Sequence, residues 1–118
     1  MGAGLSKNRI KGLSASVDQN SAVLILGTLP GRMSLTYGKY YADPSNKFWD
    51  ILFIACGEKI DKTDQGKKQL LEKYHIALWD ILYSAVRKTS NDKDISDETP
   101  NNLPLFLSQY PNIKLLIF

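Results

Sequence analysis

The sequence predicts an α/β fold, a three-layer α/β/α sandwich around a small parallel sheet. The run from Ser21 to Gly27 is continuously apolar, rich in branched side chains and closed by glycine, as in a strand buried on both faces. Two further apolar runs, at 76–79 and 113–118, show the same character. Helical periodicity lies between these runs, and parallel strands are normally joined by crossover helices that cover both faces of the sheet.

Two helices are expected between the first and second strands. Asp43 can cap the first of them and Pro44 can begin it, because proline is favoured at the first helical position. The second is expected over residues 63–74, with apolar side chains inward and lysines outward. A short helix is expected at 103–109. The polar stretch 88–102, rich in Asp, Asn and Ser, is expected to be a loop.

The chain is expected to have two parts. Residues 1–20 mix Gly, Ser and Lys with isolated apolar residues, which is typical of a flexible basic arm. Residues 21–118 are expected to form a single domain. Its last apolar run has no helix behind it, so we expect this domain to be incomplete on its C-terminal side.

Composition and charge narrow the class of protein. The 118 residues are 43% hydrophobic and carry a net charge of +3 with a pI near 9.0, which mildly favours a polyanionic partner. Scattered lysines can also serve only to keep a surface soluble. No apolar run approaches the roughly 20 residues that a membrane span requires, and the single cysteine cannot form an internal disulfide. We therefore expect a cytoplasmic protein with no membrane partner.

The chemically informative segment follows the first strand. It contains Gly27-Thr-Leu-Pro-Gly31 and Tyr40-Tyr-Ala-Asp-Pro-Ser-Asn46, and Phe48-Trp49 comes directly afterwards. Ligands of open α/β sheets bind beyond the carboxyl ends of the strands, which is where this segment begins. It has neither a P-loop ending nor a Gly-x-Gly-x-x-Gly pattern, so nucleotide binding of those kinds is disfavoured. The lone histidine, His75, has no Cys, His or carboxylate cluster around it, and we expect neither a metal nor a cofactor.

These motifs resemble the uracil-DNA glycosylase superfamily, whose mismatch-specific members carry Gly-x-x-Pro-Gly after the first strand. The segment Tyr-Tyr-Ala-x-Pro-x-Asn-x-Phe-Trp is most similar to the hypoxanthine-DNA glycosylase (DNA-deoxyinosine glycosylase) branch. The stretch 78–82 with Arg87, and Tyr110-Pro-x-Ile-Lys114, also fit that branch. The resemblance covers roughly residues 20–118.

The resemblance implies hydrolysis of the N-glycosidic bond of a deaminated base that has been flipped out of DNA. Hypoxanthine is expected ahead of uracil in a G:U mismatch, with a monomer acting on nucleoid DNA. One alternative is a non-catalytic DNA-binding fragment or remnant of such an enzyme, because the superfamily's second motif would lie beyond residue 118. A small-molecule nucleotide hydrolase, which would act on free nucleosides and not depend on DNA, is a further alternative.

Roles for individual residues follow from the resemblance. Mismatch-specific relatives usually carry Asn where this chain has Thr28, so activation of the water is assigned to Asn46. The residues expected to bind the base are Gly27, Thr28, Leu29, Pro30, Gly31, Tyr41, Phe48 and Asp80. Those expected to hold flanking phosphates are Arg32, Ser34 and Lys39.

Structural roles remain open for several of these positions. Asn46 can cap a helix, Phe48 and Trp49 can be core aromatics, and Asp80 can cap a loop.

Overall fold

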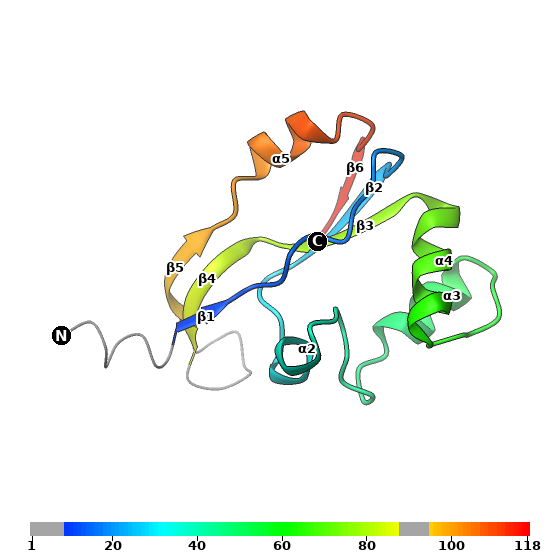
Figure 1. The fold of residues 1–118 in the computed structure, drawn as a ribbon, viewed down its shortest axis with the longest axis horizontal. Coiled ribbons are helices and arrows are strands. Elements are labelled where there is room, and N and C mark those ends of the chain that lie inside the picture. The colour runs from blue at the N-terminus through cyan, green and yellow to red at the C-terminus, as the bar shows by residue number, and fades with distance from the viewer. Residues whose placement is uncertain (1–8, 88–94) are drawn as a thin grey trace.

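The computed structural model describes residues 9–87 and 95–118 and contains two three-stranded sheets (Figure 1). The first is parallel, in the order β3 (Ile76–Asp80), β2 (Val23–Gly27), β6 (Leu115–Ile117). Strand β2 is central and its apolar side chains are enclosed on both faces, with Leu24 fully buried. The predicted parallel sheet is therefore confirmed, with its three strands at the three apolar runs.

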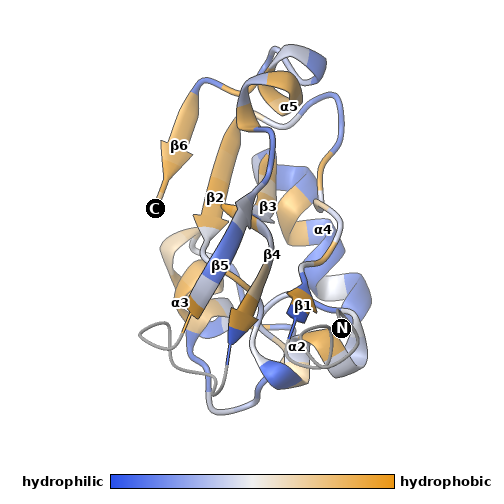
Figure 2. Cartoon of the chain, turned by 90° about the vertical axis from the view of Figure 1, so that its left-hand side faces the viewer, coloured by the Kyte–Doolittle hydropathy of each residue, from blue (hydrophilic) through white to orange (hydrophobic). Residues whose placement is uncertain are grey.

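Helices cover both faces of this parallel sheet (Figures 1 and 2). On one face, α3 (Phe48–Ala55) and α4 (Asp64–Tyr74) bury Trp49 and Phe53 against the sheet. On the other, α5 (Leu103–Gln109) buries Phe106. This arrangement confirms the three-layer α/β/α prediction, and in the described part of the chain no helix is long and apolar enough to cross a membrane.

Helix boundaries follow local capping chemistry. Helix α4 lies within one residue of the range expected for it, and Thr63 caps it, because the Thr63 hydroxyl accepts a hydrogen bond from the Gly66 amide at 3.0 Å. Helix α3, in contrast, begins four residues later than predicted. The Asp43 carboxylate accepts hydrogen bonds from the Ser45 amide and hydroxyl at 2.9 and 2.8 Å, so Asp43 and Pro44 form a turn before the helix instead of starting it.

The second sheet is antiparallel, and the sequence did not predict it. Its order is β1 (Arg9–Lys11), β4 (Leu82–Arg87), β5 (Ile95–Pro100). Strand β5 falls inside the segment 88–102 that was expected to be a loop, of which residues 88–94 lie outside the described residues.

The expected flexible arm is ordered over residues 9–20. Strand β1 pairs with β4, and Ile10 packs against the buried cluster of Leu29, Leu82 and Ala85. Ser16 exchanges two backbone hydrogen bonds of 2.9 Å with Leu78. Isolated apolar residues therefore suffice to hold residues 9–20 once the edges of β4 and β3 are available for backbone pairing. Residues 1–8 lie outside the described residues.

Candidate active site

A cavity of about 380 Å³ lies beyond the carboxyl ends of β2 and β3. Residues 27–34 form one side of it. They run from the end of β2 through a loop into the first turn of the short helix α2 (Arg32–Tyr37), which the sequence did not predict. The remaining lining residues come from the segment before α3, from the end of β3 and from the end of β4: Tyr40, Tyr41, Asp43, Asn46, Asp80 and Arg87. The cavity thus occupies the edge at which open α/β sheets bind ligands.

Gly27 and Asp80 form the end of the parallel sheet inside this cavity. They are direct partners in the β2–β3 register, and Asp80 is only 5% exposed. A Cβ atom on Gly27 would lie 2.6 Å from Oδ1 of Asp80 and 3.4 Å from the hydroxyl of Tyr41. Glycine is therefore required here for space, because the carboxylate and the phenol occupy the position that a side chain would take.

Two tyrosines beside Asp80 are held in their neutral form. Burial, and then the charge of Asp80, raise the pKa of both Tyr40 and Tyr41 above the ordinary tyrosine value of 10.0. The Tyr40 hydroxyl donates to the backbone carbonyls of Leu13 and Ser14, at 3.2 and 2.9 Å. Tyr41 adopts a left-handed backbone conformation with a φ of 53°. A neutral phenol at Tyr41 can donate a hydrogen bond to a ligand.

The loop 27–31 is tied to the second sheet at three points. The amides of Ile81 and Leu82 donate to the carbonyls of Gly27 and Thr28, at 2.8 and 3.1 Å. The guanidinium of Arg87, itself only 7% exposed, donates to the Pro30 carbonyl at 2.5 Å. These bonds hold the loop in place beside the cavity.

Arg87 lines the cavity, although the sequence assigned it no role there. Irregularities in the β4–β5 register between Leu82 and Val86 break the alternation of buried and exposed residues. No periodicity in the sequence therefore marks Arg87 as inward-facing. The only feature of the sequence that singled out Arg87 was that, with the stretch 78–82, it fits the hypoxanthine-DNA glycosylase branch.

Asn46 borders the cavity and also has a structural role. Its Oδ1 atom accepts a hydrogen bond from the Phe48 amide at 2.8 Å, at the start of α3. Its own amide donates to the Asp43 carbonyl at 2.9 Å. This hydrogen bond and a place in the cavity are compatible, because an amide oxygen has two lone pairs and the Phe48 amide uses only one of them.

The aromatic residues divide between the cavity and the core. The rings of Tyr41 and Phe48 stack with their centroids 3.7 Å apart, and only Tyr41 lines the cavity. Trp49 is 4% exposed and its indole nitrogen donates to the Tyr40 carbonyl at 3.1 Å, which confirms the interpretation of Trp49 as a core aromatic. Phe48 thus supports the ring of Tyr41 from behind.

The predicted phosphate contacts are not all at this cavity. Arg32 and Ser34 line it, and the buried Ser34 hydroxyl accepts from the Ala42 amide at 3.2 Å. Lys39 instead lines a second cavity and pairs with Asp64 at 2.9 Å. Of the residues predicted to act on the DNA, all except Phe48 and Lys39 therefore meet around one cavity. Among the described residues, no group of three His, Cys, Asp or Glu side chains is arranged to hold a metal ion.

The fold and this site together define the class of protein. Residues 15–118 match the family described as the uracil DNA glycosylase superfamily. The chain belongs to the uracil DNA glycosylase superfamily.

Within that superfamily, the chain is similar to proteins named hypoxanthine DNA glycosylase from Methanosarcina barkeri (strain Fusaro) and Methanosarcina acetivorans. Each is 34% identical over 109 residues, which make up 92% of this chain and 69% of the relative. The fold is also similar to a solution NMR structure of a candidate uracil DNA glycosylase from M. acetivorans, with a TM-score of 0.80 and 33% identity. That match covers 92% of this chain and 68% of the other. The predicted resemblance is confirmed at the level of family and fold.

Proposed function

We propose that the protein is a monofunctional DNA glycosylase that hydrolyses the N-glycosidic bond of hypoxanthine, or of uracil in a G:U mismatch. The observation that carries this proposal is the single cavity that brings Asn46, Asp80 and the loop 27–31 together at the carboxyl edge of the sheet. Its volume of about 380 Å³ lies within the range of ligand pockets. The names of the similar Methanosarcina proteins support the same activity.

A flipped base would be recognised by the hydrogen-bonding groups of the cavity. Deamination converts adenine N1 from an acceptor into an N–H donor and replaces the amino group by a carbonyl. The Asp80 carboxylate can accept from that N–H, and the amides of the loop 27–31 can donate to the carbonyl. Adenine offers the opposite pattern, so this arrangement favours hypoxanthine over adenine. Uracil presents an N–H beside a carbonyl in the same way.

Bond cleavage requires charge stabilisation on both fragments. The sugar passes through an oxocarbenium-like state, and negative charge develops on the leaving base. The loop amides and the neutral Tyr41 phenol can stabilise that charge by donating hydrogen bonds. Asn46 can orient a water with the second lone pair of its Oδ1 atom, but an amide is too weak a base to remove a proton early. The water therefore attacks late, after the glycosidic bond has largely broken.

The proposal is tested by single-turnover base release from duplex DNA that contains one deoxyinosine or one deoxyuridine opposite guanine. We expect wild-type protein to release hypoxanthine faster than uracil. Asn46→Ala is expected to lower the rate by about 100-fold or more, the scale on which a positioned acid–base group contributes. Asn112→Ala, whose side chain bonds the Gln19 carbonyl, is the matched control and should keep the rate.

Because Asn46 also accepts the hydrogen bond from the Phe48 amide at the start of α3, its two roles must be separated. Asn46→Ser retains a side-chain oxygen that can accept this bond but is too short to orient the same water, so its rate should fall as far as that of Asn46→Ala. A serine variant with full activity would show that only the bond to the Phe48 amide matters. A folded wild-type chain that binds the duplex without releasing either base would instead favour a non-catalytic DNA-binding module. The proposal takes the active species to be a monomer in the cytoplasm, acting without a cofactor.

A further inference from the structure

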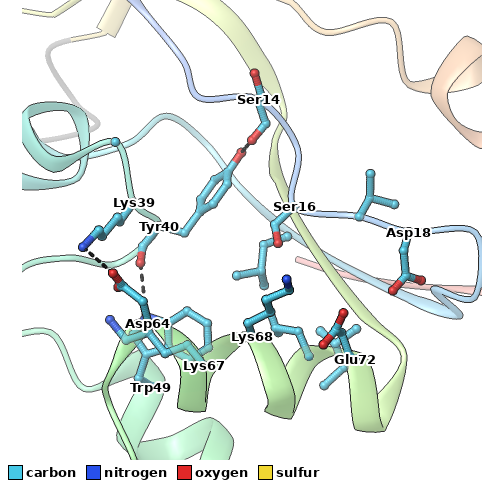
Figure 3. A pocket seen from close by; sticks show the side chains of 15 residues that line it. Ser14, Ser16, Asp18, Lys39, Tyr40, Trp49, Asp64, Lys67, Lys68 and Glu72 are labelled. Carbon is cyan, nitrogen blue, oxygen red and sulfur yellow. Dashed lines mark hydrogen bonds and ion pairs between the residues drawn. The ribbon is translucent and has the colours of Figure 1, made fainter.

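A second cavity, of about 360 Å³, lies beside the candidate active site (Figure 3). It runs between helix α4 and the segment 14–18, and Tyr40 lines both cavities. Its floor is apolar and includes Trp49, Leu71 and Leu78, while its rim carries charged side chains. The two cavities are therefore neighbours, separated at one point by a single tyrosine.

Lys67 places a half-buried ammonium group at one end of this second cavity. Its Nζ atom lies 5.1 Å from the centroid of the Trp49 ring. None of the ion pairs within residues 9–87 and 95–118 involves Lys67. Burial lowers the pKa of Lys67, and the positive charges of Lys39 and Lys62 lower it further against the opposing effect of Asp64. Positive charge is therefore concentrated here without full compensation.

The acidic residues at this end are already engaged by other lysines. Asp64 pairs with Lys39 at 2.9 Å, and Asp50 pairs with Lys62 at 2.9 Å. Figure 3 shows Lys39, Asp64 and Lys67 together at one end of the cavity, with Asp18 and Glu72 at the other. An anion that enters this cavity would therefore be attracted to the Lys39–Lys67 end and repelled from the opposite end.

The position of this basic end relates it to the active site. Helix α4 precedes β3 and its first turns lie toward the carboxyl edge of the sheet, the edge at which the loop 27–31 begins. We propose that Lys67 and Lys39 bind a backbone phosphate of the DNA strand whose flipped nucleotide occupies the active-site cavity. This inference rests on the proposed function, and it adds a phosphate contact outside the base pocket.

The salt dependence of DNA binding tests this proposal. Each neutralised phosphate contributes about −0.9 to the slope of log K against log salt for duplex DNA. Lys67→Gln should therefore make the slope shallower by up to about 0.9, because Lys39 remains at the same phosphate, as measured by fluorescence anisotropy with a duplex containing one deoxyinosine. Lys114→Gln is the matched control, because it removes the same charge just before β6, the edge strand on the far side of β2 from β3. It should leave the slope unchanged. Equal slopes for the two variants would overturn the proposal.

A second variant works in the opposite direction. Asp64→Asn frees Lys39 from its ion pair and removes a carboxylate that repels phosphate, so it should tighten DNA binding about two- to fivefold at low salt. Weaker or unchanged binding would count against the proposal, even where Lys67→Gln unfolds the chain. A third measurement adds inorganic phosphate and follows the NMR signals of α4. If phosphate shifts these signals while the salt slopes of DNA binding stay equal for Lys67→Gln and Lys114→Gln, the site binds a free anion. That result would overturn its assignment to DNA.

The inference and the proposed function fail in different ways. Base release at saturating protein should be the same for Lys67→Gln and wild type, because Lys67 is absent from the active-site cavity. Base release with equal salt slopes overturns only the phosphate contact. A shallower slope for Lys67→Gln with no base release from wild type leaves the DNA contact in place and overturns only the glycosylase activity.

Discussion

Gly27→Ala is the most direct test of how the floor of the active-site cavity is built. The new methyl group would lie 2.6 Å from Oδ1 of Asp80, so the carboxylate must retreat by about 0.8 Å to reach the ordinary contact distance of 3.4 Å. Asp80 is 5% exposed and has little room to move. Overpacking of this kind costs about 1–3 kcal/mol. The φ of Gly27 is outside the left-handed region, so alanine returns about 0.4–1 kcal/mol by restricting the unfolded chain.

The expected net loss is about 1–2 kcal/mol in the free energy of unfolding, or roughly 4–8 °C in Tm. Urea and thermal unfolding followed by circular dichroism measure both quantities. Gly31→Ala is the control, because nothing lies within 4 Å of its Cβ position, and its stability should change by no more than about 0.5 kcal/mol. In an Asp80→Ala background, Gly27→Ala should cost nothing. A loss that persists in that background would refute the steric argument.

Two further predictions concern neighbouring groups. Arg87→Met leaves the Pro30 carbonyl without its charged donor and should cost about 1.5–3 kcal/mol in urea unfolding, whereas a loss below about 0.5 kcal/mol would show that the contact does not hold the loop. Because folding raises the pKa of Tyr40, the folded state keeps the phenol proton that the unfolded chain loses, so its contribution to stability is complete below pH 10.0 and falls at higher pH. Tyr40→Phe should reduce the steepness of that fall by up to about 1.4 kcal/mol per pH unit, less any solvent screening. Identical pH profiles for the two proteins would contradict the shift.

The parallel half of the fold was predictable because its signals are local. A continuous apolar run identifies β2, since a central strand has no face in contact with water. The helical spacing of apolar residues identifies α4, because this pattern extends over only a few residues. The site could be located for the same reason, as the glycine-containing loop 27–31 directly follows a recognisable strand.

The antiparallel half was not predictable because its stability comes from distant partners. Strand β5 is almost entirely polar and exposed, and it is a strand only because its backbone pairs with β4. Strand β1 has one half-buried apolar residue, Ile10, and likewise depends on β4. The delayed start of α3 reflects competition between a local Asp43 turn and a helix cap, which the sequence permits equally.

The direct passage from β3 to β4 also affects how the cavity forms during folding. Only Ile81 separates the two strands, and the amides of Ile81 and Leu82 close onto the loop after β2. Arg87 and Pro30 are 57 residues apart in the chain. Such distant contacts cost loop-closure entropy before they contribute stability, so the cavity assembles late, after the local helices. The amide protons of Ile81 and Leu82 should therefore exchange with solvent through a partial opening that leaves the helices intact, and a destabilised chain loses its site before the rest of its fold.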